Sequence, residues 1–212
     1  MVDTPLYVAF VAAAFVLCVT PGPDMMFVVA MGGRGGPTTG VMAALGVAFG
    51  AMVHAVAAAL GLSALFTSLP TLYDTLRWVG AAYLFYLAIT AFRDRSDLGG
   101  DAAAAAGGPG PGRLRTFRQG AITNMLNPKV ILFNVAFLPQ FVNPSLGHTG
   151  WQLAILGLTL VFVGLTVDTS IGLLSGRLAS LLRSSRRVAR GLNVFSGTVF
   201  AGLAVRLATT SD

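Results

Sequence analysis

The sequence predicts an all-α integral membrane protein whose six transmembrane helices form two inverted repeats of three, with the first and fourth helices broken. First, 55% of the 212 residues are hydrophobic and only 10% are charged, so too few polar side chains exist to cover a soluble surface. Second, six apolar stretches reach about the 20-residue length with which a helix crosses a bilayer. Third, prolines interrupt the first and fourth of these stretches at similar depths.

One low-complexity segment divides the apolar stretches into two groups of three. The stretches cover residues 6–31, 40–62, 72–92, 117–142, 151–175 and 189–207. The segment GGDAAAAAGGPGPG, residues 99–112, is rich in Ala, Gly and Pro and is typical of a flexible linker. It separates a first repeat, 1–98, from a second, 113–212. Because each repeat has an odd number of helices, the second enters the membrane from the opposite side, which makes the repeat an inverted one.

Positive charge is distributed unevenly between the two ends of the predicted helices. The formal net charge is +6, and most arginines lie in the loops after the first, third and fifth stretches. Loops rich in Lys and Arg favour the cytoplasmic side, so both termini are expected outside. We therefore interpret the basic balance as a topology signal and expect no nucleic-acid partner. Binding of anionic lipid by the same arginines is a secondary interpretation.

The helix breaks are the strongest indication of a binding site. Pro21 and Pro23 in TPGPD, and Pro128 in NMLNPK, each free backbone groups that lipid cannot satisfy. Such a break presents amides at the start of one half-helix and carbonyls at the end of the other, which can hold a carboxylate and an ammonium respectively. A zwitterion matches such a site.

Two opposite charges, Asp24 and Lys129, lie beside the two breaks. A charge deep in a bilayer is costly unless it is paired, hydrated or neutralised. The two charges are expected to pair in an empty site and to separate around a zwitterion. The alternatives are a permanent ion pair that locks the halves together, or two shallow interfacial charges. Asn124, Asn127 and Asn134 supply uncharged groups around the second break, either for a substrate or only for freed backbone.

Asp168 and His54 are the remaining titratable candidates within the predicted spans. Either side chain could carry a proton that couples transport to the proton gradient. For His54, a structural hydrogen bond between helices is the favoured alternative. For Asp168 the functional role is favoured, because a carboxylate in the middle of a span is difficult to explain structurally.

Three long motifs occur in a fixed order: TPGPDMMFVVAMGGRGGPTTGVMAALGVAFG, VGAAYLFYLAITAFR and FRQGAITNMLNPKVILFNVAFLPQFV. In this order and spacing they resemble the LysE/RhtB family of amino-acid exporters, strongly as far as Val142 and more weakly beyond it. The resemblance implies a multi-pass inner-membrane translocator that exports amino acids or close derivatives, is driven by the proton motive force and forms a homodimer. The family pattern falls on Pro21, Gly22, Pro23, Asn127, Pro128 and Lys129. The role of Asp24 comes from the physical argument alone.

Other classes of function fit the sequence less well. The main alternative is export of another small solute such as an inorganic cation, although a heavy-metal path would show several soft or carboxylate ligands facing one another. An enzyme is not expected, because HExxH, GxSxG and similar signatures are absent. Cys18 is the only cysteine, which excludes an internal disulfide and a cysteine metal cluster, and no cofactor is expected. A purely structural membrane subunit would not need charges at paired helix breaks.

Overall fold

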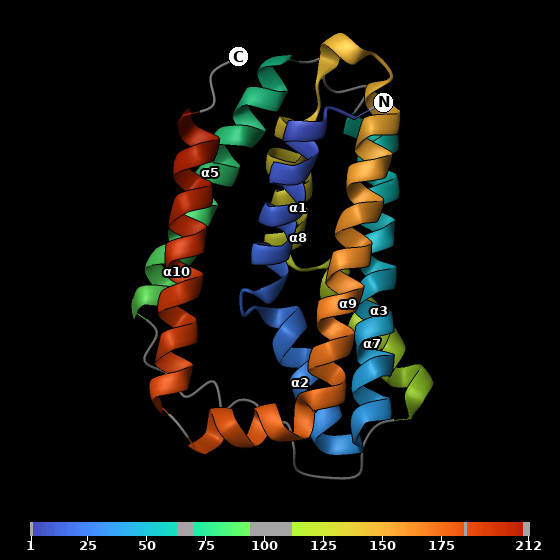
Figure 1. Ribbon diagram of the computed structural model, residues 1–212, viewed down its shortest axis with the longest axis vertical. Helices are drawn as coiled ribbons and strands as arrows, with labels where there is room; N and C mark the ends of the chain where they lie inside the picture. Colours follow the sequence, from blue (N-terminus) through green and yellow to red (C-terminus); the bar gives the residue numbers. More distant parts are fainter. Residues whose placement is uncertain (1, 63–69, 94–111, 185, 210–212) are drawn as a thin grey trace.

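The computed structural model describes residues 2–62, 70–93, 112–184 and 186–209, and every regular element among them is a helix (Figure 1). The predicted all-α class is therefore confirmed for this part of the chain. Nearly all of the predicted linker, residues 99–112, lies outside the described residues. The division of the chain into two repeats stays a prediction.

The first apolar stretch forms two helices joined at a bend of 50°. α1 (Thr4–Val19) begins after the N-cap Asp3, and α2 (Pro23–Gly35) starts at the second proline of the break. A proline donates no backbone hydrogen bond and disfavours helical geometry in the residue before it. Accordingly, Thr20 and Gly22 have extended backbones, and the break predicted at TPGPD is present.

The fourth apolar stretch breaks in the same way, with a bend of 49°. α7 (Arg113–Met125) ends just before Asn127, whose side chain caps α8 (Pro128–Leu132). The chain then continues as the π-helical turn η2 (Phe133–Phe137) and the 3-10 turn η3 (Leu138–Phe141). The two breaks therefore have different continuations, α-helical in the first and irregular in the second.

One long helix packs against helices of both halves of the chain. This helix, α3 (Pro37–Ala57), is extended by the π-helical turn η1 (Ala58–Leu62) and packs against both α7 and α9. α9 (Thr149–Ser184) follows the short 3-10 turn η4 (Pro144–Leu146), and its last turns run across the lower end of the molecule (Figure 1).

Glycines allow α3 to approach its neighbours closely. A Cβ added at Gly40 would lie 2.6 Å from the carbonyl oxygen of Gly172 in α9. A Cβ added at Gly50 would lie 2.7 Å from the carbonyl oxygen of Ala121 in α7. Such small-residue contacts are typical of helices packed within a membrane, and they fix the positions of α7 and α9 around the two breaks.

α5 (Pro70–Arg93) and α10 (Arg186–Thr209) pack against each other at one side of the molecule (Figure 1). Of these two helices, α5 contacts the second broken helix through η2, and α10 contacts α9. The largest apolar core cluster connects them to the remainder, because Leu84 of α5 and Phe200 of α10 belong to the same cluster as Phe10 of α1.

The lengths and surfaces of the helices are those of a membrane protein. α9, α10 and the combination of α3 with η1 each contain an apolar segment long enough to cross a bilayer, and each bent pair can form one further span. By length and composition the described residues hold up to five spans; the third predicted stretch lies in α5, where the apolar helix Trp78–Arg93 is shorter. The six-helix inverted arrangement therefore stays a prediction. Leu60 and Phe162 are 76% and 71% exposed, as expected of side chains that face lipid.

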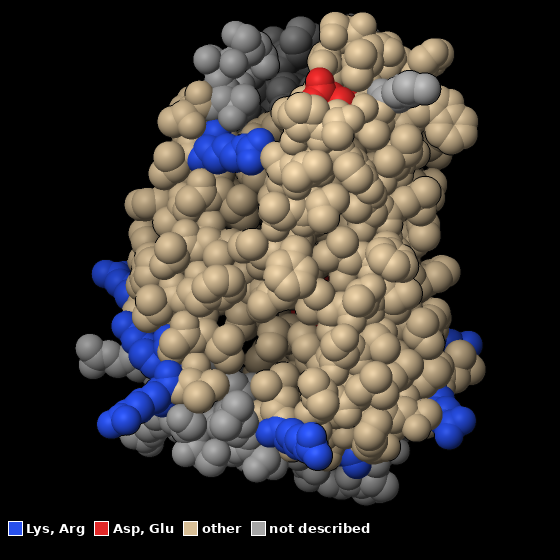
Figure 2. Space-filling view, viewed as in Figure 1, with Lys and Arg blue, Asp and Glu red and all other residues tan. Residues whose placement is uncertain are grey.

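Charged side chains avoid the middle of the visible surface (Figure 2). Most of the visible lysine and arginine side chains lie at the end opposite the chain termini, which are marked in Figure 1, and the visible acidic group lies near the N-terminus. We call these two ends the arginine end and the termini end. The apolar band between them matches a hydrocarbon layer.

Candidate functional site

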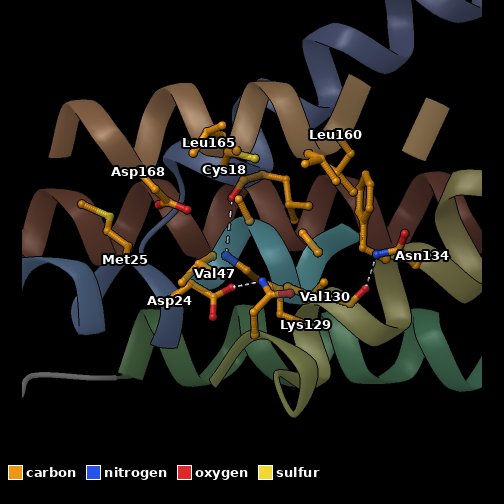
Figure 3. Close-up of a pocket in the computed structure, with 17 residues that line it drawn as sticks. Cys18, Asp24, Met25, Val47, Lys129, Val130, Asn134, Leu160, Leu165 and Asp168 are labelled. Atoms are coloured by element: carbon orange, nitrogen blue, oxygen red, sulfur yellow. Dashed lines mark hydrogen bonds between the residues drawn. The ribbon is translucent and has the colours of Figure 1, made fainter. Parts of the chain in front are cut away.

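A cavity lies where the two broken helices meet (Figure 3). Its volume, counted as the space open to the centre of a water molecule, is about 60 Å³. Side chains from α1, α2, α3, α7, α8, η2 and α9 line it, so both halves of the chain contribute. Five of the predicted site residues are among the lining residues: Asp24, Asn124, Lys129, Asn134 and Asp168.

The carboxylate of Asp24 is held by two amide groups from the second break. Asn124 Nδ2 and Asn127 Nδ2 each donate a hydrogen bond of 2.9 Å to Asp24 Oδ2. Asp24 lies in the first turn of α2, where the positive end of the helix dipole favours negative charge. Its other oxygen, Oδ1, is buried and has no hydrogen-bond partner in the described part of the chain. One carboxylate oxygen therefore stays available to a donor on a bound molecule.

The ammonium group of Lys129 lies at the end of α1. Lys129 Nζ donates hydrogen bonds to the carbonyl oxygens of Thr20, at 3.2 Å, and Leu17, at 3.4 Å. The last carbonyls of a helix have no partner within it, and the negative end of the helix dipole favours a cation there. The Lys129 ammonium is therefore the cation bound at the end of α1. It has three N–H donors, and the third is not used in these two hydrogen bonds.

Asp24 and Lys129 do not form the ion pair expected of an empty site. The carboxylate is bonded to two asparagine amides and the ammonium to two backbone carbonyls, and no ion pair joins them to each other within the described residues. The expectation was wrong because the two breaks supply enough neutral partners to satisfy both charges at separate positions. A permanent ion pair that locks the halves together is not seen either.

Gly22 leaves room for the ammonium group of Lys129. The backbone of Gly22 is extended, with φ of −168°, so its conformation does not require a glycine. A Cβ added there would instead lie 2.9 Å from Lys129 Nζ, too close for an undisturbed side chain. The glycine between Pro21 and Pro23 therefore leaves the Lys129 ammonium in its present position, and a larger residue would displace it.

Asp168 reaches the cavity from α9 (Figure 3). It is buried, and its carboxylate makes no hydrogen bond to any described residue. Asp24 and Lys129 line the same cavity. With all three side chains ionised, the cavity has one unbalanced negative charge. A buried charge of this kind requires a counter-ion, a proton or water.

The other predicted residues support the cavity in different ways. Asn134 Nδ2 donates to the carbonyl oxygen of Val130 at 2.9 Å, while the side-chain oxygens of Asn134 and Asn124 are buried without a partner. His54 does not line the cavity; its Nε2 lies 3.4 Å from the carbonyl oxygen of Asn124. This contact is the inter-helix hydrogen bond considered above for His54. Pro128 begins α8 without lining the cavity.

The apolar wall of the cavity has no counterpart among the residues singled out in the sequence. It includes Met25, Val47, Val130, Phe133, Leu160, Val161 and Leu165. Apolar side chains occur at most positions of a membrane helix, so those that face a cavity and those that face lipid look alike in sequence. The carbonyls of Leu17 and Thr20 could have been found, because they precede a proline break and helix ends leave carbonyls free.

Residues 15–211 of the chain match the family described as LysE type translocator. The chain belongs to this family. It is 33% identical over 203 residues to an uncharacterized membrane protein of Pseudomonas aeruginosa, covering 95% of this chain and 94% of that protein. It is 31% identical over 205 residues to a leucine efflux protein of Enterobacter sp., with 94% and 93% covered. It is also 30% identical over 203 residues to a leucine efflux protein of Salmonella choleraesuis, with 96% and 94% covered.

No solved structure matches the chain. The family resemblance recognised in the sequence is confirmed, and this LysE translocator is a membrane transporter rather than an enzyme. The cavity at the two breaks, which combines buried charges with an apolar wall, is its candidate site for a transported solute.

We expect Gly22→Ala to lower the transport rate of this LysE translocator at least about tenfold, which corresponds to about 1.4 kcal/mol. The added methyl group would push the Lys129 ammonium away from its two carbonyl partners. The measurement is the initial rate of solute efflux at equal protein levels in the membrane. Gly202→Ala in α10 is the matched control, because a Cβ there meets no atom within 4 Å. Equal rates for the two variants would contradict the role given to Gly22.

Proposed function

We propose that this LysE translocator exports α-amino acids with aliphatic side chains from the cytoplasm in exchange for protons. Membership in a translocator family is shown; the substrate class, the direction and the driving force go beyond it. The relatives named leucine efflux proteins support the substrate class and the direction, because each aligns over more than nine tenths of both chains.

The composition of the cavity is the observation that carries the substrate class. The unpartnered oxygens of Asp24, Asn124 and Asn134 are acceptors suited to the three N–H donors of an α-ammonium group. The unused donor of Lys129 is suited to an α-carboxylate. The remaining wall is apolar and mostly aliphatic, with Val47, Val130, Leu160, Val161 and Leu165, which favours an apolar substrate side chain.

The size of the cavity fits a compact solute. On the same volume measure, one water molecule needs about 10–15 Å³, so the cavity of about 60 Å³ has room for a few water molecules. No group of three or more His, Cys, Asp or Glu side chains within the described residues is arranged to hold a metal ion, so no specific observation favours the alternative of cation export.

We place the arginine end of the molecule in the cytoplasm of the cell and both chain termini outside. The support is the distribution of charge: Arg34 ends α2, Arg93 ends α5, and Arg113 and Arg115 begin α7. The opposite end has Asp3 at the start of α1. Loops rich in arginine stay on the cytoplasmic side of a bacterial inner membrane.

Two features of the packing support six spans in two inverted repeats. The bends at the two breaks are nearly equal, 50° and 49°. α3 packs on the broken pair of the second half, and α9 packs on the broken pair of the first half, while α3 contacts α9 and α5 contacts α10. These four contacts would be unchanged if the halves were exchanged, as in an inverted repeat, whereas the contact of α2 with α3 has no counterpart of similar extent in the described part of the second half. A homodimeric state is proposed from the family resemblance alone.

Exchange of an amino acid for protons can result from competition between a proton and the substrate ammonium group for Asp24 and Asp168. With three ionised side chains, the cavity has one negative charge in excess, which either a proton or the ammonium group of a substrate can balance. If the two bind alternately to the same carboxylates, one leaves the site as the other arrives. A site open to one side at a time would then move the amino acid outward and the proton inward.

We expect Asp168→Asn to abolish the response of transport to a pH gradient while exchange of labelled for unlabelled substrate continues. The asparagine keeps the shape of the side chain but cannot take up and release a proton. Efflux driven by an imposed gradient and exchange without a gradient are measured in the same vesicles. Asp3→Asn, at the start of α1, is the matched control and should retain both activities. Gradient-driven efflux at the wild-type rate in Asp168→Asn would remove this residue from the coupling mechanism.

The substrate class is tested in cells that contain or lack the protein and are loaded with a panel of dipeptides. Individual amino acids released into the medium are quantified over time, with and without an uncoupler. Faster release of leucine and other aliphatic amino acids, abolished by the uncoupler, is the expected result. Equal release across the panel, with the protein present in the membrane, would contradict amino-acid export and make inorganic cations the next substrates to test.

A further inference from the structure

Four phenylalanine rings extend from the cavity toward the termini end of the molecule. Phe10 of α1, Phe133 and Phe137 of η2, and Phe141 of η3 are 0%, 0%, 0% and 1% exposed. The ring centroids of Phe133 and Phe137 are 4.8 Å apart, and those of Phe137 and Phe141 are 5.2 Å apart. Phe10 joins both ends of the series, at 5.2 Å from Phe141 and 6.4 Å from Phe133. We call these four residues the phenylalanine cluster.

The phenylalanine cluster begins at the cavity wall and ends beneath an arginine. Phe133 lines the cavity, as do Leu17 and Leu160, and all three belong to the same apolar core cluster. At the other end the guanidinium of Arg206, in the last turn of α10, lies 4.5 Å from the ring centroid of Phe141. Such a position over a ring face stabilises the cation and the ring together. Buried aromatic side chains therefore lie between the cavity wall and Arg206.

The segment that contributes three of these rings is not an ordinary α-helix. η2 is a π-helical turn and η3 is a 3-10 turn containing Pro139. Turns of both kinds inside a helix often mark hinges or functional positions. The side-chain oxygens of Asn134 and Gln140, both in this segment, are buried without a hydrogen-bond partner. Another arrangement of η2 and η3 could give these two oxygens hydrogen-bond partners. Movement of this segment therefore costs less free energy than movement of a regular helix would.

The side of the cavity toward the arginine end is built differently. There α2, α3 and α9 meet through small residues, with Gly32 against Ser175 and Gly40 against Gly172. The structure therefore has an aromatic cluster on one side of the cavity, and closely packed small residues with an apolar cluster that includes Met31 on the other.

We propose that the phenylalanine cluster is the outer gate of the transport path, that Arg206 holds it shut, and that η2 and η3 move to open it. The proposal depends on the chain being a transporter and not on the identity of its substrate. A transporter must expose its site to one side at a time, and this structure is closed on the termini side. Opening requires Phe137 and Phe141 to leave the space above Phe133.

Cys18 provides a direct test, because it is the only cysteine in the chain and it lines the cavity. The full-length protein is placed in sealed vesicles of both orientations, with an N-terminal tag reporting which end faces out. A membrane-impermeant maleimide is added without substrate, and the rate of Cys18 modification is measured from each side. We expect slow modification of the wild-type protein from the termini side.

We expect Phe137→Ala to raise the modification rate from the termini side at least about tenfold, which corresponds to a shift of about 1.4 kcal/mol in the equilibrium between closed and open gate. The rate from the arginine end should not rise. Arg206→Ala, which leaves the core intact, should produce a smaller increase on the same side only. Phe15→Ala and Phe162→Ala are the matched controls, because these side chains are 54% and 71% exposed on the surface.

Three outcomes would overturn the gate proposal. They are rapid wild-type modification from the termini side, equal rates for Phe137→Ala and the two control variants, and an increase from both sides, which indicates general loosening. Cys18→Ala gives the background. None of these readouts involves an amino acid, so failure of the gate proposal is distinguishable from failure of the proposed substrate.

Discussion

An Asp24→Asn variant is expected to transport its substrate at least about 100-fold more slowly than the wild-type protein, equivalent to about 2.8 kcal/mol. An asparagine at this position can still accept both hydrogen bonds from Asn124 and Asn127 through one oxygen, so the local structure is expected to persist. What changes is the group that replaces Oδ1. In the variant an amide NH2 group takes the position of this carboxylate oxygen and points toward the substrate ammonium. Both groups are hydrogen-bond donors, so no hydrogen bond can form between them.

The measurement for Asp24→Asn is the initial rate of efflux, normalised to the amount of protein in the membrane. Asp3→Asn is again the matched control, because Asp3 caps α1 through Leu6 N and accepts a bond from Asn143 far from the cavity. The control should transport at nearly the wild-type rate. Wild-type flux in Asp24→Asn itself would remove Asp24 from the mechanism, whatever its hydrogen bonds.

A Lys129→Met variant is expected to lose transport to a similar extent, at least about 100-fold. Methionine fills nearly the same volume, so apolar packing in the cavity is retained. The variant lacks the donor for the substrate carboxylate and leaves the carbonyls of Leu17 and Thr20 without the cation that they bind. Hydrogen bonds to charged groups contribute about 1.5–3 kcal/mol each, so loss of both roles has a large effect.

Arg115→Met is the control for Lys129→Met, because Arg115 is an exposed cation in the first turn of α7, outside the cavity. The two variants remove the same formal charge, and only the one in the cavity should stop transport. The effect of the lysine variant is measured by efflux, and its insertion by the amount of protein in the membrane. Transport by Lys129→Met that equals transport by Arg115→Met would show that the buried ammonium has no part in binding.

The breaks and the residues that meet there could be predicted because they depend on local chemistry. Prolines end helices wherever they occur, and charges in apolar stretches are rare enough to attract attention. Asp24 and Lys129 therefore stand out in the sequence, and both line the same cavity. Their separate hydrogen bonds could not be predicted, because the choice between a carbonyl, an amide and an opposite charge depends on distances that only the packing of α2 against α7 and α8 determines.

The apolar features of the site could not be predicted for a different reason. Phe133 and Phe137 are two of many aromatic residues in a chain with 14 phenylalanines, and the sequence does not distinguish those in a cluster from those that face lipid. The π-helical geometry of η2 has no sequence signal of its own either. Three-dimensional packing alone places these rings above the cavity and beneath Arg206.

Export of aliphatic amino acids in exchange for protons is tested with the purified protein in proteoliposomes loaded with labelled leucine. A pH gradient, acid outside, is imposed across the membrane, and the release of leucine is measured with and without an uncoupler. We expect the gradient to accelerate release by the wild-type protein, the uncoupler to abolish the acceleration, and Asp24→Asn not to respond. Release equal to that of protein-free liposomes, with the protein inserted and folded, would contradict the proposal that the cavity at the two helix breaks exports aliphatic amino acids.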